Sequence, residues 1–142
     1  MNDLDIRAMA AASYNEAYEA VESLENPAWA VELAATSLNL WRRVGNEQNL
    51  SIGCWLYSRA LSKVGAHEAA IAVANNMLSH LAAIDEPADW LVASAHEGWA
   101  RALGGAMDER LAAALEQALA SIAAIQAEAD RQLIQSQIAD LL

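Results

Sequence analysis

The sequence predicts an all-α fold, and three observations lead to that prediction. About a quarter of the residues are alanine, proline occurs only twice and β-branched residues are sparse, which favours helix along nearly the whole chain. A weak internal repeat with a period of about 40 residues indicates stacked helix pairs. A chain of 142 residues forms one domain, residues 1–142. The repeat aligns Ala20 with Ala60 and Ala100, Val31 with Ile71 and Leu111, Ala34 with Ala74 and Ala114, and Gly65 with Gly105.

Breaks in the helical pattern delimit the first four expected helices. The first covers residues 3–24, and Pro27 lies in the first turn of the second, where its missing N–H costs nothing. The second helix ends before Gly45, which suits the position after a helix C-terminus. The third runs from residue 46 or 49 to 64 and ends at Gly65, and the fourth covers residues 66–84. The inward face of the first helix is expected to carry Ile6, Met9, Tyr14, Ala17 and Val21.

The last third of the chain leaves one alternative open. Pro87 opens a fifth helix that continues to residue 103, where Gly104-Gly105 is expected to end it, and a sixth helix starts near residues 106–108. The apolar positions then follow a heptad spacing until the phase slips near residues 126–130. This slip predicts either a seventh, capping helix or a single long bent helix over residues 106–141. The heptad positions are Leu111, Leu115, Ala118, Ile122, Ile125 and Ala129.

Charge and cysteine content exclude several classes of function. The formal net charge is −11, which argues against nucleic acid and against anionic membranes as partners. No apolar run approaches the length of a membrane span, and the N-terminal residues do not resemble a signal peptide. The single cysteine, Cys54, fits a reducing compartment and is expected to be buried. We therefore expect a cytoplasmic protein.

The stretch from Cys54 to Ile71, CWLYSRALSKVGAHEAAI, resembles a helical hairpin of the tetratricopeptide-repeat superfamily. Gly65 stands at the turn glycine of that family, and Ala70 stands at the small residue where the two helices touch. The resemblance extends over roughly residues 9–120. It implies a right-handed superhelix of about three antiparallel hairpins plus a C-terminal capping helix, and a protein that binds other proteins.

The resemblance also implies a concave groove lined by the first helix of each pair. This places Asn15 and Glu19, then Trp55, Arg59 and Lys63, and then Ala95 and Trp99 on the groove. Helical geometry independently puts Trp55, Arg59 and Lys63 on one face, where they could grip a carboxylate or an acidic peptide segment. The alternative interpretation is that Arg59 and Lys63 pair with acids such as Glu19 or Glu22 while Trp55 is part of the core. Trp99 could serve either the groove or the core.

No catalytic constellation, phosphate-binding loop or metal-ligand spacing stands out, so we expect neither catalysis, nor a cofactor, nor a metal. The predicted function is a scaffold or chaperone-like module of bacterial type that binds a peptide segment of an unidentified partner. The alternative is a homodimer that pairs through the heptad seam, in which the repeat has a purely architectural role.

Overall fold

The computed structural model describes residues 1–23 and 25–142, and this part of the chain contains helices but no strand. The predicted all-α class is therefore confirmed. The end of the first helix predicted at Leu24 lies outside the described residues. The elements are α1 (Asp3–Ser23), α2 (Pro27–Val44), α3 (Glu47–Lys63), α4 (His67–Ala82), α5 (Asp89–Gly105), α6 (Leu111–Ala123), α7 (Glu128–Ile138) and a short 3₁₀ helix η1 (Ala139–Leu141).

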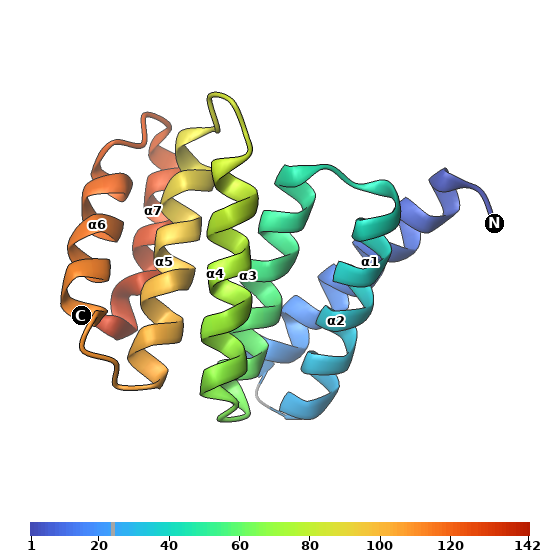
Figure 1. Ribbon diagram of the computed structural model, residues 1–142, viewed down its shortest axis with the longest axis horizontal. Helices are drawn as coiled ribbons and strands as arrows, with labels where there is room; N and C mark the ends of the chain where they lie inside the picture. Colours follow the sequence, from blue (N-terminus) through green and yellow to red (C-terminus); the bar gives the residue numbers. More distant parts are fainter. Residues whose placement is uncertain (24) are drawn as a thin grey trace.

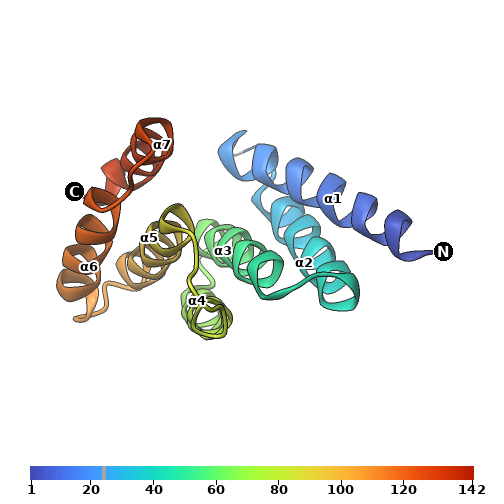
Figure 2. The same cartoon turned by 90° about the horizontal axis from the view of Figure 1, so that it is seen from above.

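Helices that follow one another in the chain lie side by side (Figure 1). The closest packing joins α1 to α2, α3 to α4 and α5 to α6, and α3 also packs directly on α5. Figure 2 shows that α1 and α7 face each other across one side of the molecule, with α3 and α5 between them, while α2, α4 and α6 lie on the outer side. The odd-numbered helices therefore surround a common concave side.

Local signals in the sequence account for most helix ends. The side chain of Asn26 caps α2 by accepting from the backbone N–H of Trp29, 3.2 Å away, and Pro27 occupies the first turn. Asn46 and Asn49 form a reciprocal capping box at the start of α3. Gly65 follows α3 with a φ of +78°, a conformation that glycine adopts without steric cost.

The helix ends at Gly45 and at Gly104-Gly105 differ in detail from the prediction. Gly45 follows α2 in an extended conformation, with its N–H bonded to the carbonyl of Trp41, so it is not a left-handed cap. Gly104 and Gly105 are the last two residues of α5, so this helix ends two residues later than the predicted residue 103. The chain turns at Met107 instead, with a φ of 53°. The sixth helix therefore begins at Leu111 rather than near residues 106–108.

The C-terminal segment forms two helices, which decides between the alternatives for residues 106–141. The break covers residues 124–127, between α6 and α7. Ile122 and Ile125 of the predicted heptad seam are buried against Ile134 and Ile138 of α7 and against Ala93 of α5. These two seam positions are thus covered by the chain itself.

Small residues let the helices approach closely. A Cβ added at Gly98 of α5 would lie 2.7 Å from Cδ1 of Trp55 on α3 and 3.2 Å from Met77 on α4, well inside van der Waals contact. On α1, the buried positions include Ala10, whereas Met9 is 45% exposed. Met9 was predicted to face inward, and that prediction is wrong by one position, because Ala10 lies on the buried face of α1 together with Ile6 and Ala17.

No helix within residues 1–23 and 25–142 has both the length and the apolar character to cross a membrane.

Candidate functional site

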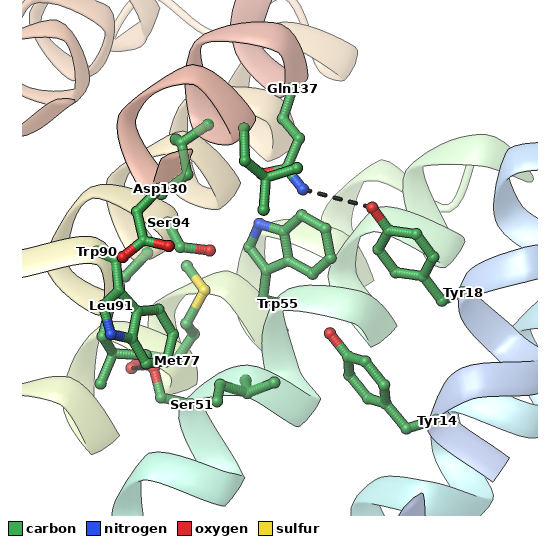
Figure 3. Close-up of a pocket in the computed structure, with 14 residues that line it drawn as sticks. Tyr14, Tyr18, Ser51, Trp55, Met77, Trp90, Leu91, Ser94, Asp130 and Gln137 are labelled. Atoms are coloured by element: carbon green, nitrogen blue, oxygen red, sulfur yellow. Dashed lines mark hydrogen bonds between the residues drawn. The ribbon is translucent and has the colours of Figure 1, made fainter. Parts of the chain in front are cut away.

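A cavity of about 290 Å³ opens on the concave side. Its walls come from helices far apart in the sequence, namely α1, α3, α4, α5 and α7 (Figure 3). Most of the lining is apolar or aromatic, as in sites that bind organic side chains or small molecules. The lining residues are Tyr14, Tyr18, Ser51, Ile52, Trp55, Met77, Trp90, Leu91, Ser94, Ala95, Asp130, Leu133, Ile134 and Gln137.

Four aromatic side chains dominate the cavity. Tyr14 and Tyr18, one turn apart on α1, stack with their ring centroids 6.5 Å apart, and Tyr18 stacks on Trp55 at 6.2 Å. Figure 3 shows Trp90 on the opposite side, beyond Met77. Burial raises the pKa of the Tyr14 phenol, as does neighbouring Tyr18, against an opposing effect of Arg59. Tyr14 therefore offers a neutral hydroxyl to a ligand.

A few polar groups are set among these apolar walls. Ser51 donates to the carbonyl of Met77 across 3.4 Å. Nε2 of Gln137 donates to the hydroxyl of Tyr18, also 3.4 Å away, and so links α7 to α1. Within residues 1–23 and 25–142, Asp130 is the one charged residue of the lining. Its carboxylate lies beside Ser94 and Trp90 in Figure 3.

Next to the cavity, Trp55 joins a buried network centred on Glu97, whose side chain is fully buried. The indole N–H of Trp55 donates to Oε2 of Glu97 at 2.7 Å. Oε1 accepts from Nη1 of Arg59 at 3.2 Å and from Nε of Arg101 at 2.8 Å. A buried carboxylate needs such partners, because an unpaired charge in the interior costs several kcal/mol.

Two exposed acids extend the network to other elements. Glu22 of α1 lies 3.4 Å from Arg59, and Asp140 of η1 lies 2.8 Å from Arg101. Hydrogen bonds from Arg101 lower the pKa of Asp140 to about 2. Burial alone would lower the pKa of Arg101, but its bonds to Asp140 and Glu97 outweigh that effect and raise it. The network thus joins α1, α3, α5 and η1.

The residues predicted to line a groove lie in different surroundings in the structure. Trp55 and Ala95 are buried but contribute to the cavity wall. Arg59 is 9% exposed and pairs with Glu22, as the alternative interpretation expected, and with Glu97. Lys63 is exposed, eight residues along α3 from Trp55, and lies in a separate hollow.

The other predicted residues lie away from the cavity. Trp99 is half-buried, and the guanidinium of Arg110 covers its ring at 5.3 Å from the centroid. Asn15 and Glu19 are exposed on α1 and do not line the cavity, whereas their neighbours Tyr14 and Tyr18 do. The side of α1 that lines the cavity is therefore offset by one position from the two residues predicted to line a groove.

Sequence reasoning missed most of the residues that form the cavity. The spacing of Tyr14 and Tyr18 by four residues was a usable signal, because it puts two aromatic rings on one helix face. The contributions of Trp90, Asp130 and Gln137 depend on how α5 and α7 fold back over α3, and no local pattern encodes that arrangement.

A second hollow of about 290 Å³ lies between the last turns of α3 and α5. Its cations are Arg59, Lys63 and Arg101, of which the two arginines already pair with Glu97, Glu22 and Asp140. This hollow is therefore less cationic than its lining suggests. It is lined by Arg59, Ser62, Lys63, Arg101, Gly104, Gly105 and Leu141.

The described residues contain no group of three or more His, Cys, Asp or Glu side chains that could hold a metal ion.

Cys54 is buried as predicted, and burial raises the pKa of its thiol to about 11, far from the range of a reactive thiolate. Nδ1 of His80 lies 2.6 Å from Oε2 of Glu47. Burial lowers the pKa of His96.

Comparison with known proteins adds no family assignment. No protein-family model, no curated protein and no solved structure matches the chain.

Proposed function

We propose that this protein is an interaction module, without catalytic activity of its own, that binds a peptide segment of a partner protein on its concave side. The observation that carries the proposal is the aromatic cavity between α1, α3, α5 and α7. Its volume of about 290 Å³ accommodates one or two side chains. Burying one large apolar side chain there would contribute about 1.5–3 kcal/mol.

The polar groups at the cavity suit an extended backbone. The hydroxyl groups of Tyr14 and Ser94 and the amide of Gln137 lie among apolar walls, and they can hydrogen-bond peptide N–H and C=O groups. Such a site combines an apolar anchor pocket with a few orienting contacts, as peptide-binding sites do.

We further propose that the helices form three antiparallel hairpins in a right-handed superhelix of the tetratricopeptide-like type, with α7 as the cap. The odd-numbered helices on the concave side support this arrangement (Figure 2), as does Gly65 at the turn between α3 and α4. The single buried thiol of Cys54 fits the reducing environment of a cytoplasm.

The test is selection from a random peptide library displayed on phage. Peptides selected on the wild-type chain are measured against Ser94→Phe, which adds a ring at the cavity wall. The matched control is Ser79→Phe, at an exposed site on α4 that does not line the cavity. We expect Ser94→Phe to lose binding by at least tenfold and Ser79→Phe to retain it.

Both variants are checked by circular dichroism, so that lost binding is not confused with lost folding. Should the selected peptides bind folded Ser94→Phe as tightly as the wild type, the cavity is not the peptide site and the proposal fails.

A further inference from the structure

The cavity combines four aromatic rings with one unneutralised carboxylate, and we infer from this that its occupant is a basic side chain, lysine or arginine, of the partner peptide. The inference rests on the proposed peptide binding and specifies the anchor residue. In this arrangement the methylene chain of the anchor lies among the rings while its cationic end meets Asp130. Lysine and arginine side chains have this division into apolar stem and charged head.

Among the residues that the structure describes, Asp130 is the only charged one that lines the cavity. Among the described residues, no hydrogen bond or ion pair engages its side chain, whereas its neighbour Arg131 is held by Glu128 and by the carbonyl of Ile125 at 3.0 Å. The carboxylate in Figure 3 lies at the cavity beside Ser94 and Trp90. A ligand cation would therefore meet an acceptor that no described side chain already occupies.

The aromatic walls favour a cation as well, because the faces of indole and phenol rings carry negative electrostatic potential. This chain already uses such contacts in three places. The guanidinium groups of Arg7, Arg59 and Arg110 lie 5.9, 5.4 and 5.3 Å from the ring centroids of Trp41, Trp55 and Trp99. Trp90, which lines the cavity near Asp130, has no such partner among the described residues.

The charges around the cavity disfavour an acidic anchor. The neighbouring network contains two guanidinium groups, Arg59 and Arg101, and three carboxylates, those of Glu97, Glu22 and Asp140, which leaves it with one excess negative charge. The formal net charge of the chain is −11. Such a field steers cationic segments toward the protein and repels acidic ones. Arg59, which was expected to grip a carboxylate, has its charge compensated by Glu22 and Glu97.

The test compares three blocked pentapeptides, acetyl-Ala-Leu-X-Leu-Ala-amide, in which X is arginine, norleucine or glutamate. Binding is followed by NMR through the indole N–H signals of Trp55 and Trp90, which report on the cavity. We expect the arginine peptide to bind about three- to tenfold more tightly than the norleucine peptide, because a partly exposed ion pair and a cation–π contact each contribute modestly. The glutamate peptide should bind most weakly.

Two variants and a control assign the preference to Asp130. Asp130→Asn keeps the shape of the side chain and should bind the arginine and norleucine peptides equally. Adding Ser94→Asp to that variant returns a carboxylate to the cavity and should restore the preference. Glu116→Gln removes the same charge from an exposed site on α6, outside the cavity, and should leave the preference unchanged.

The outcomes separate the anchor from the peptide site. If the norleucine peptide binds as tightly as the arginine peptide, the basic anchor is refuted while peptide binding stands. If Asp130→Asn retains the preference for arginine, the carboxylate of Asp130 is not what the anchor meets, and the inference drawn from this cavity is refuted. If none of the peptides shifts the indole signals of Trp55 and Trp90, both the anchor and the proposed peptide site are refuted.

Discussion

The side chain of Glu97 lies at the centre of a buried hydrogen-bond network that joins α3 to α5. It is fully buried, yet it accepts hydrogen bonds from Trp55, Arg59 and Arg101. Two guanidinium groups converge on one of its oxygens, and the indole takes the other. The position of Trp55 in the cavity wall therefore depends on a charge that is hidden from solvent.

Replacing Glu97 by glutamine should lower the free energy of unfolding by about 3 kcal/mol or more. The amide is nearly isosteric, but it leaves Arg59 and Arg101 without the buried negative charge. The measurement is urea unfolding followed by circular dichroism, with the exposed Glu116→Gln as control, for which the change should stay within about 0.5 kcal/mol. A loss below 1 kcal/mol for Glu97→Gln would contradict a structural role for the network.

Two glycines of the same helix should respond to alanine with opposite signs. At Gly98 the added methyl group meets Trp55 at 2.7 Å, so Gly98→Ala should destabilise the fold by roughly 1–3 kcal/mol. At Gly104 the nearest atom lies 3.5 Å away, an ordinary contact with Leu141. Gly104→Ala should therefore stabilise α5 by about 0.5–1 kcal/mol, the usual gain in helix propensity. Urea unfolding of both variants tests this, and two changes of the same sign would contradict the packing described.

At the scale of the elements, the sequence predicts helix ends well where a side chain or ring fixes them locally. Pro27 and the Asn46 capping box mark the starts of α2 and α3, and both starts follow from residues within one turn. The end of α5 was predicted two residues early, because the helix includes Gly104 and ends at Gly105, and the chain turns at Met107. Glycine permits a helix end but does not impose one.

The attachment of η1 to α5 should depend on pH through Asp140. Its pKa is about 2 in the folded protein against an ordinary value of 3.8, so the ion pair with Arg101 stabilises the fold above about pH 4. That contribution disappears as the pH falls through 2, where the folded protein also binds the proton. The Asp140 side chain is 64% exposed, so the effect should stay below about 1 kcal/mol.

Wild type and Asp140→Asn are compared by urea unfolding between pH 5 and pH 2. The difference between their free energies of unfolding should shrink steadily over this range. A difference that stays constant down to pH 2 would show that Asp140 acts through packing rather than charge.

At the scale of the whole molecule, α7 and α1 are brought together although they stand at opposite ends of the described chain. The contact between Gln137 and Tyr18 links them across the concave side. The all-α class and most helix positions could be predicted, because periodicity and caps are local. The cavity could not, because Tyr18, Trp90 and Asp130 become neighbours only when three distant helices pack. Trp55 was predicted to share one helix face with Arg59 from their spacing alone, and in the structure it is buried and lines the cavity.

Tyr18→Phe should loosen α7 without unfolding the protein. It removes the hydroxyl that accepts from Gln137, and at 3.4 Å this bond contributes no more than about 1 kcal/mol to global stability. Hydrogen exchange measured by mass spectrometry should become faster in α7 and stay unchanged in α3. Tyr57→Phe, on α3 and outside the cavity, is the control. Equal exchange in wild type and Tyr18→Phe would show that the contact does not hold α7 in place.

The burial of Cys54 has a practical consequence for kinetics. The thiol is 1% exposed and its pKa is about 11 in the folded protein, so almost no thiolate is available at pH 8 until α3 separates from its neighbours. Once exposed to water, the thiol returns to an ordinary pKa near 8.5 and reacts at once with an aromatic disulfide reagent. The colour released by that reaction would time each opening of the core, with no engineered label required.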